Sequence, residues 1–380
     1  MNTGMQPAGS MRLFRAFAGI GAMAIVAGTF LAPARMSSNL LLVSYFLLGI
    51  GLAAAFFVAL EYVTGAGWSV ALRRVPEAAS SALPAGAAGL ILFFILGSWL
   101  YPWTHEQPAG FKALWLDLPF FLARAVIYLA VWMGFAWAVI RNSRRQDADG
   151  DLVFSRRNTR LSVIFLFAFA VTFSLASFDW IMALEPHWAS TIFGVYNFAG
   201  LFSSGLAVII LLVIRLRNHG PLRDFVNQEH LHDLGKLLFA FSTFWMYIWF
   251  SQYMLVWYAN ITEEAVYYVR RQQGLWTPLF LLNMLLNWAI PFLVLLPKST
   301  KRNPGILAKV AVVVLAGRWL DLYLMIVPAV SEKPAFGIWE AALGLGALGV
   351  FMLAFTRAFS SSAPVPVRDP NLIESLHYHN

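Results

Sequence analysis

Residues 156–184 read RRNTRLSVIFLFAFAVTFSLASFDWIMAL, in which an arginine-rich start precedes a 24-residue run of mostly apolar side chains. A helix needs about 20 residues to cross a hydrocarbon core of about 30 Å, so this run is long enough to span a membrane. Similar runs recur along all 380 residues, of which 59% are hydrophobic and 12% charged. The sequence therefore predicts an all-α integral membrane protein.

Ten such runs can be distinguished, and we expect them to form one membrane domain over residues 1–380. Their expected ranges are 12–33, 39–63, 82–101, 114–140, 161–184, 189–214, 233–260, 275–296, 304–328 and 336–359. The longest expected loop, 141–160, holds 20 residues, which is too short for a globular domain. Residues 360–380 are expected to form a tail.

Lys and Arg alternate from loop to loop between these runs. One side of the membrane receives 18 of them: Arg12, Arg15, Arg73, Arg74, Arg141, Arg144, Arg145, Arg156, Arg157, Arg160, Arg215, Arg217, Arg223, Lys298, Lys301, Arg302, Arg357 and Arg368. The other side receives five: Arg35, Lys112, Arg270, Arg271 and Lys333. Positive residues mark the cytoplasmic side, so both termini and the tail are expected there. The net charge of +8 is thus interpreted as a signal of topology in a lipid bilayer, with no nucleic-acid partner.

The N-terminal run allows two interpretations. Arg12 and Arg15 precede an apolar stretch that ends at Ala32-Pro33-Ala34, which resembles the cleavage site of a signal peptide. The stretch is long for a signal peptide, however, and the charge alternation continues through it. We therefore expect a retained first helix, with cleavage as the alternative.

The chain has no cysteine, which excludes iron–sulfur ligation, covalent c-type haem and disulfides. All seven histidines fall in loops, at helix ends or in the tail, so the expected spans offer no axial ligand for a haem at mid-membrane depth. We expect no metal and no redox cofactor in this chain. Any redox centres that it serves belong to other subunits.

The chain carries a weak internal repeat with an offset of four helices. An Asp stands seven residues before a Pro at the end of two runs, in Asp179–Pro186 and Asp321–Pro328. Two other runs begin alike, with Leu114, Trp115, Pro119 and Arg124 against Leu275, Trp276, Pro278 and Asn283. The repeat predicts two four-helix bundles in the same orientation, residues 39–184 and 189–328, with helices 12–33 and 336–359 outside them.

Ionisable side chains within a membrane are costly, so each one is a candidate for function. Asp117, Arg124, Asp179, Arg318 and Asp321 are expected in the outer half, as members of a proton path or a quinone pocket. The alternative is structural: buried ion pairs that fix helix register without turnover.

The spacing of these residues suggests how they pair. Arg318 and Asp321 are three apart on one helix face and are expected to form an ion pair. Arg124 has no carboxylate at that spacing on its own helix. Asp117 is two turns earlier on the same side, and Asp179 on the next helix is the natural partner of Arg124. Asp179 is expected two turns from the outer end of its helix and has Ala176 in the position of Arg318. It should therefore hold its proton more readily, unless Arg124 reaches across.

Three residues near the inner side form a second candidate group. Glu61 lies near the end of its run, and His232 and Asp233 open another. Histidine titrates near neutral pH, so the three are candidates for a cytoplasmic proton entry. The alternative is that Asp233 is simply an acid in the first turn of a helix, where the helix dipole favours it.

Several longer strings resemble a known family. They are Phe178-Asp179-Trp180-Ile181-Met182, Glu185-Pro186-His187-Trp188, Ser190–Tyr196, His230–Phe241, Ser251–Leu255 and Asp369–Leu376. In sequence and order they resemble the F subunit of bacterial alternative complex III, a quinol:electron-acceptor oxidoreductase related to the polysulfide-reductase-type membrane subunits.

The resemblance implies a multi-pass subunit of the bacterial inner membrane that binds no cofactor and supports proton conduction and assembly. It implies iron–sulfur and c-type haem subunits and a paralogous membrane subunit as partners, and it carries the polar positions over to Asp179 and Asp321. Two alternatives stay open: that this chain itself binds and oxidises quinol, and that it is an independent secondary transporter. The apparent absence of a helix broken at its centre opposes the transporter.

Overall fold

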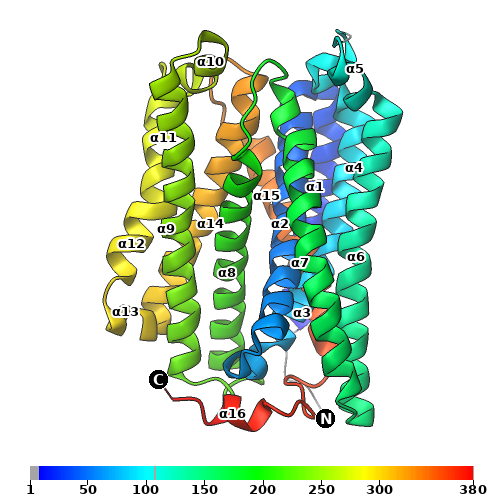
Figure 1. Ribbon diagram of the computed structural model, residues 1–380, viewed down its shortest axis with the longest axis vertical. Helices are drawn as coiled ribbons and strands as arrows, with labels where there is room; N and C mark the ends of the chain where they lie inside the picture. The colour runs from blue at the N-terminus through cyan, green and yellow to red at the C-terminus, as the bar shows by residue number, and fades with distance from the viewer. Residues whose placement is uncertain (1–7, 107, 380) are drawn as a thin grey trace.

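The computed structural model describes residues 8–106 and 108–379, and every regular element in these ranges is a helix. The long helices run side by side along the longest axis of the molecule (Figure 1). They are α1 (Ala8–Leu31), α2 (Pro33–Thr64), α4 (Leu83–Gly97), α6 (Leu118–Asp149), α7 (Val153–Trp180), α8 (Phe193–His219), α9 (Gln228–Ala259), α14 (Pro304–Ile326) and α15 (Ile338–Ser360).

Shorter elements complete or connect these helices. They are η1 (Gly67–Leu72), α3 (Arg74–Ala79), η2 (Ser80–Ala82), η3 (Ser98–Leu100), η4 (Pro102–Thr104), α5 (Phe111–Trp115), η5 (Met182–Leu184), α10 (Thr262–Arg271), α11 (Trp276–Met284), η6 (Leu285–Ala289), α12 (Ile290–Leu295), α13 (Lys298–Arg302), η7 (Val327–Ala329) and α16 (Leu372–Leu376).

The prediction of an all-α membrane protein is confirmed. Within the described ranges, nine helices are long and apolar enough to cross a membrane. The remaining expected span, 233–260, corresponds to α9, which is 32 residues long and lies beside α8 and α11 (Figure 1). It is not among the nine, and its sequence is rich in charged residues at its start and in Ser, Gln, Trp and Tyr further on.

Eight of the spans form two rings of four. In the first ring, α2 contacts α4 and α7, and α6 contacts α7 and α4. In the second ring, α8 contacts α9 and α14. The span formed by α11, η6 and α12 completes this ring through contacts with α14 and α9. These are the helices of the expected bundles 39–184 and 189–328. The rings meet where α8 contacts α2 and α7, and α8 is the most enclosed span, with 89% of its apolar window buried.

Helices α1 and α15 pack against each other outside the rings. They approach closely where Gly21 faces Gly346, because a Cβ added at either glycine would lie 2.6 Å from the Cα of the other. Small residues permit such close backbone contact between membrane helices. The pair is attached to the first ring mainly through contacts of α15 with α2 and α3.

The expected loop 141–160 is mostly helical. α6 continues to Asp149 and α7 begins at Val153, so the connection shrinks to a turn at Gly150, whose φ of 74° lies in the left-handed region that favours glycine. The expected boundaries were wrong because they followed apolarity, and a helix does not stop where its side chains become polar.

The expected span 275–296 contains a π-helical turn at its centre. This turn, η6, joins α11 to α12 just before Pro291, which has no N–H to donate within the helix. The backbone stays helical on both sides of the turn, so the span is distorted at its centre but continuous from Trp276 to Leu295.

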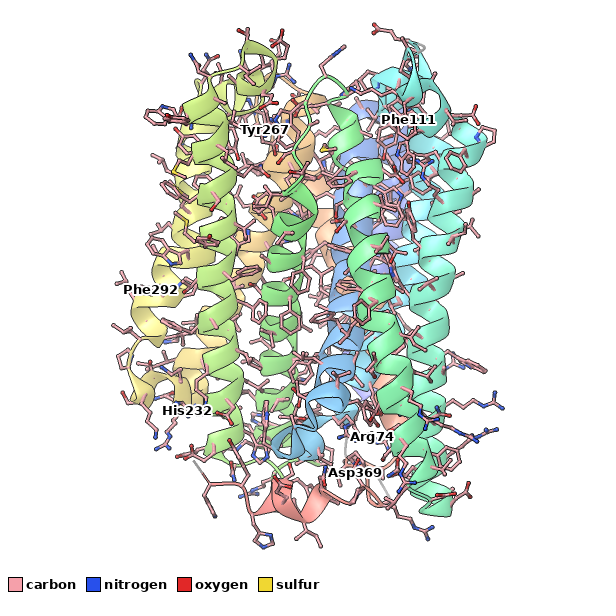
Figure 2. All side chains as sticks on the ribbon, in the orientation of Figure 1. Arg74, Phe111, His232, Tyr267, Phe292 and Asp369 are labelled. Carbon is pink, nitrogen blue, oxygen red and sulfur yellow. The ribbon has the colours of Figure 1, made fainter. Side chains whose placement is uncertain are left out.

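The two ends of the molecule differ in charge. We call the end that carries Arg74, His232 and Asp369 the basic end, and the end near Phe111 and Tyr267 the opposite end (Figure 2). The segment α16 lies across the basic end (Figure 1).

Candidate functional site

The Asp179 carboxylate lies in the last turn of α7 and is 1% exposed. Arg124 of α6 reaches across to it, with Nε donating to Oδ2 at 3.0 Å and Nη2 to Oδ1 at 3.0 Å. Trp115 Nε1 donates to Oδ1 at 2.8 Å and the Tyr128 hydroxyl donates to Oδ2 at 3.2 Å. Four donors thus face the roughly four lone-pair sites of the carboxylate.

Two expectations about this site need correction. Asp179 is one residue from the end of α7 instead of two turns inside it, because Met182–Leu184 form a separate turn, η5. Asp117 is not one of the buried charged residues, although its expected place in the outer half of the membrane implied burial. It is exposed and caps α6, accepting a hydrogen bond from the backbone N–H of Phe120 at 3.4 Å.

The Asp321 carboxylate on α14 is fully buried. Arg318 Nη1 lies 2.6 Å from its Oδ2, so the expected ion pair is confirmed. Trp245 Nε1 donates to Oδ2 at 3.2 Å, and Asn283 Nδ2 donates to Oδ1 at 3.1 Å. The Tyr196 hydroxyl also donates to Oδ1. This carboxylate likewise receives four donors, one of them an arginine.

The two sites share a plan but take their arginine from different helices. The residue five after the proline donates to the carboxylate in both bundles: Arg124 in the first and Asn283 in the second. The residue three before the aspartate is Ala176 in the first and Arg318 in the second. Because Arg124 supplies the missing cation, the expected contrast in charge compensation at Asp179 is absent.

Arg318 also connects the two rings. Its Nη2 donates to Asn197 Oδ1 at 3.2 Å, and the Tyr45 hydroxyl lies 3.5 Å from the same oxygen and 3.2 Å from Ser177 Oγ. The guanidinium passes so close to α8 that a Cβ on Gly200 would lie 2.3 Å from Nη1. Glycine at this position is therefore required for the buried arginine.

A small cavity links Asp321 to the opposite end. Its volume is about 20 Å³, enough for one water molecule, and its lining includes Gln252, Tyr268 and Arg271. Arg271 is 2% exposed and forms an ion pair of 2.6 Å with Glu185. A row of polar groups thus runs from the buried carboxylate toward the loops of this end.

Burial raises the pKa of both Tyr267 and Tyr268 on α10, which lies outside the spans. Both hydroxyls therefore stay protonated at neutral pH. Tyr268 accepts a hydrogen bond from Gln252 Nε2 at 2.9 Å, which leaves its own proton available to a neighbour in the cavity.

The candidates at the basic end also lie near one another. Glu61 is 5% exposed, and its Oε2 has no hydrogen-bond partner among the described residues. Its charge interacts with that of Asp233, which pairs with Lys236. His232 Nδ1 lies 4.0 Å from Asp233 Oδ1. The structure places these side chains at the junction of the two rings, while a role in proton entry stays a prediction.

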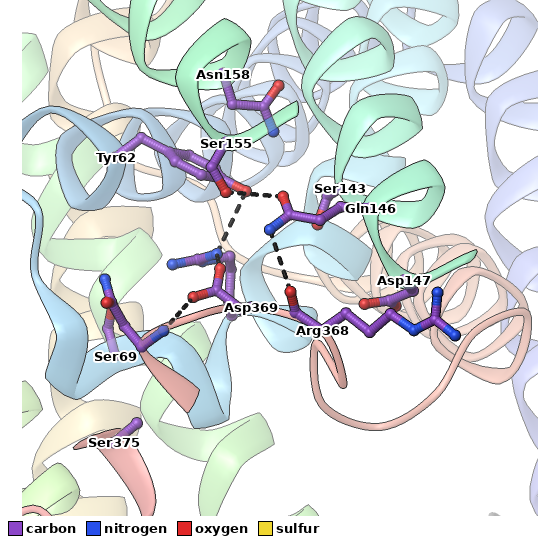
Figure 3. Close-up of polar contacts among 12 residues, drawn as sticks. Tyr62, Ser69, Ser143, Gln146, Asp147, Ser155, Asn158, Arg368, Asp369 and Ser375 are labelled. Atoms are coloured by element: carbon purple, nitrogen blue, oxygen red, sulfur yellow. Dashed lines mark hydrogen bonds and ion pairs between the residues drawn. The ribbon is translucent and has the colours of Figure 1, made fainter. Parts of the chain in front are cut away.

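The tail covers this junction and is held by buried polar contacts (Figure 3). Asp369 Oδ2 lies 2.5 Å from Arg73 Nη1, and both side chains are at most 6% exposed. Burial lowers the pKa of Arg73, but Tyr62 and Asp369 outweigh this and raise it above its ordinary value, so the guanidinium stays charged. Gln146 Nε2 of α6 donates to the Arg368 carbonyl at 3.3 Å. The tail is thereby attached to the first ring.

The tail is attached to the second ring as well. Ser375 Oγ lies 3.3 Å from Nε2 of His230, which is on α9. The same hydroxyl donates to the carbonyl of Trp68, in η1 beside the first ring, at 2.6 Å. Asn227 Nδ2 donates to the Tyr378 carbonyl at 2.8 Å. Burial, together with a hydrogen bond to Asp233, raises the pKa of Tyr378 to about 12, so this hydroxyl stays a donor.

No family model and no curated protein matches this chain. Within the described ranges, no group of three or more His, Asp or Glu side chains is placed to hold a metal ion.

Sequence reasoning missed most of the neutral donors around the two carboxylates. Trp115, Tyr128, Tyr196 and Trp245 lie among 15 Trp and 12 Tyr in the chain, and nothing in their spacing separates them from interfacial or packing aromatics. Arg271 was assigned to an exposed loop. Its neighbour Tyr267, over whose ring its guanidinium lies at 3.5 Å, gave no signal in sequence.

Proposed function

We propose that this chain is an integral membrane subunit of a quinol-oxidising respiratory complex, in which it supports assembly and proton conduction. The observation that carries the proposal is the pair of buried carboxylates, Asp179 and Asp321, at equivalent positions of two similar rings. Buried ionisable groups in a membrane are costly, and they commonly mark ion and proton pathways. The strings that resemble the F subunit of alternative complex III support the same proposal.

In this proposal Asp179 and Asp321 exchange protons with the opposite end. Each carboxylate accepts hydrogen bonds from its arginine, and in this proposal proton exchange requires that contact to loosen. The cavity beside Asp321 supplies room for one water, and the Gln252, Tyr268 and Arg271 side chains continue toward the surface. Glu61, whose Oε2 has no hydrogen-bond partner in the part of the chain that the structure describes, is the proposed entry from the basic end.

The proposal also assigns orientation and partners. The basic end faces the cytoplasm, because it carries most of the Lys and Arg of the loops. The membrane is a bacterial inner membrane. Iron–sulfur and c-type haem subunits contact the opposite end, a paralogous membrane subunit lies alongside, and this chain itself binds no cofactor.

Quinol oxidation by this chain is the weaker candidate. Pockets for small organic ligands typically enclose about 300–1,000 Å³. The cavity that borders Asp321 encloses about 20 Å³, and the Arg124 guanidinium, which holds Asp179, lies 4.0 Å from the Trp115 ring and 4.5 Å from the Phe120 ring. Water fits at Asp321, whereas a quinone ring does not without rearrangement.

The test uses the assembled complex in sealed vesicles. We expect Asp179→Asn and Asp321→Asn to lower the number of protons translocated per electron while quinol is still oxidised, because an amide keeps the shape but accepts no proton. Asp117→Asn is the matched control, since Asp117 is exposed and caps a helix. Wild-type proton stoichiometry in both buried variants would make the ion pairs structural. Purification of the native chain without redox subunits would instead favour a transporter.

A further inference from the structure

The α6–α7 hairpin concentrates positive charge at the basic end. Six of its arginines are exposed: Arg141, Arg144, Arg145, Arg156, Arg157 and Arg160. On each helix they fall within a stretch of five residues, which rises about 6 Å along the helix. They therefore form one band across both helices, just beyond the apolar parts of the spans.

These arginines differ from the other arginines nearby in lacking ionic partners. Arg73 pairs with Asp369, and Arg74 pairs with Glu77 and Asp147. Among the described residues, none of the six hairpin arginines lies in an ion pair. The carboxylates of Asp149 and Asp151 stand at the tip of the hairpin, beyond the band. The band thus presents uncompensated guanidinium groups.

The surface beneath the band is apolar and hollowed. Trp137 is 62% exposed, and the guanidinium of Arg141 lies 4.9 Å from its ring centre. Trp137 and Ile140 line a shallow depression together with Arg141, Arg144 and Arg145. The volume of this depression is about 650 Å³. Interfacial tryptophans sit at the level of lipid headgroups, with the apolar region below and water above.

The same helix faces continue into the membrane as exposed apolar side chains. Val126 and Ile127 of α6 are 63% and 56% exposed, and Ile164 and Phe167 of α7 are 66% and 76% exposed. Side chains of this kind face lipid chains. The arginine band therefore lies where the headgroups of those same lipids end.

We propose that the hairpin binds anionic phospholipids, with the arginines on the phosphodiester groups and Trp137 beside the glycerol region. Guanidinium groups recognise phosphate oxygens through two parallel hydrogen bonds, and basic pockets at the cytoplasmic side of membrane helices bind anionic headgroups. The positive-inside rule requires only charge at this end, whereas this site combines unpaired arginines, an exposed tryptophan and a concave apolar surface. The proposal is independent of the proton path.

The test compares lipid responses of the purified protein in a zwitterionic detergent. Phosphatidylglycerol should raise the thermal unfolding midpoint more than phosphatidylcholine does, and native mass spectrometry should detect bound phosphatidylglycerol. In the triple variant Arg141→Gln, Arg144→Gln, Arg145→Gln, the shift should fall to that given by phosphatidylcholine. The three Arg→Lys substitutions keep the charge but lose the paired hydrogen bonds, so they should give an intermediate shift.

The matched control removes the same charge elsewhere at the basic end, with Arg215→Gln and Arg217→Gln at the end of the enclosed helix α8 and Arg223→Gln in the loop that follows it. It should respond to phosphatidylglycerol like the wild type. Equal loss in both triple variants would overturn the proposal, because charge alone would explain binding. So would a full response to inorganic phosphate, which indicates a general anion site. An unchanged lipid response with loss of a co-purifying acidic protein would assign the band to that protein instead.

Discussion

The residues around the two buried carboxylates explain why such costly groups are stable. Each carboxylate receives four donors, one of them a guanidinium, so its lone pairs are satisfied inside the membrane. Each arginine in turn has further support: Arg124 lies 4.0 Å from the Trp115 ring, and Arg318 donates to Asn197. Removing the carboxylate of such a site takes the acceptor away from all four donors, whereas removing one donor leaves three.

Arg318 and Asp321 should therefore be energetically coupled. Loss of one partner of a buried pair costs roughly 3–5 kcal/mol, because it leaves an uncompensated charge. We expect Asp321→Ala to reduce the amount of assembled protein strongly, and Arg318→Met with Asp321→Leu to recover part of it. Recovery stays partial because Tyr196, Trp245 and Asn283 lose their acceptor. Equal losses in single and double variants would show that the two residues act independently.

Gly200 offers a second measurement of the same site. Its added Cβ would lie 2.3 Å from Arg318 Nη1, so Gly200→Ala must displace the guanidinium. Overpacking of this kind typically costs about 1–3 kcal/mol. Gly134 is the control, because nothing lies within 4 Å of its added Cβ and alanine stabilises a helix interior by about 0.5–1 kcal/mol. Thermal unfolding should move in opposite directions. A neutral Gly200→Ala would mean that Arg318 has another position.

The spacing of residues along one helix was enough to predict contacts within that helix. It could not predict contacts between different helices. The pair Arg318–Asp321 follows from a separation of three residues. The pair Arg124–Asp179 depends on how α6 packs against α7, so sequence could name Asp179 as the natural partner only on the condition that Arg124 reaches across. Residue counting placed Asp117 in the membrane. It is instead the N-cap of α6, a position at which Asp is strongly preferred, and it accepts a hydrogen bond from the backbone N–H of Phe120.

At the scale of elements, the tail is a strap that joins the two rings at the basic end. It bonds to η1 and α6 of the first ring and to the start of α9 of the second. Its contacts lie over the junction at which Glu61 and Asp233 meet. Sequence analysis assigned residues 360–380 to a tail, but their polar composition gave no indication that Ser375 and Asp369 are buried or nearly so.

The strap should depend on one ion pair. Asp369→Asn leaves the buried Arg73 without its carboxylate, at a cost of roughly 3–5 kcal/mol if the strap stays docked. Undocking is the cheaper response, so we expect faster limited proteolysis of the C-terminal segment. Asp149→Asn changes an exposed carboxylate at the same end and should leave the cleavage rate unchanged. Equal cleavage rates in wild type and Asp369→Asn would assign docking to the Ser375 contacts.

The span α11–α12 shows what apolarity leaves undetermined within an element. Residues 275–296 have the length and composition of one regular span, yet η6 inserts a π turn before Pro291. Asn283 and Asn287 are four residues apart and share one helix face. Asn287 Nδ2 donates to Asn283 Oδ1 at 2.8 Å, and Asn283 donates to Asp321. The spacing predicts the contact between the two asparagines, but it does not show that their face points into the ring.

At the scale of the whole molecule, the order of the apolar helices and their charge bias were readable from sequence, because length and apolarity decide them. Nine of the ten expected spans are long and apolar enough to cross a membrane in the described ranges, and α9 is the exception. The division into two bundles rested on a weak repeat and stays a prediction, because α2 packs extensively against α8 as well as against the helices of its own ring. The chain has no cysteine, so any iron–sulfur or c-haem chemistry that it serves requires partner chains. Orientation across the membrane rests on the charge bias and is open to direct measurement.

The lack of cysteine makes the chain a background for topology mapping with single introduced thiols. We expect Glu263→Cys, at an exposed position of α10 at the opposite end, to react with a membrane-impermeant maleimide in intact cells whose outer barrier is opened. Asp151→Cys at the hairpin tip and Glu374→Cys in the tail should react only after the membrane itself is permeabilised, because the proposed orientation puts the basic end in the cytoplasm. Both positions are exposed, so burial does not limit labelling. The reverse labelling pattern would mean that the basic end faces away from the cytoplasm. The arginine band would then lie in the outer leaflet, and the proposed proton entry would lie on the outer side of the membrane.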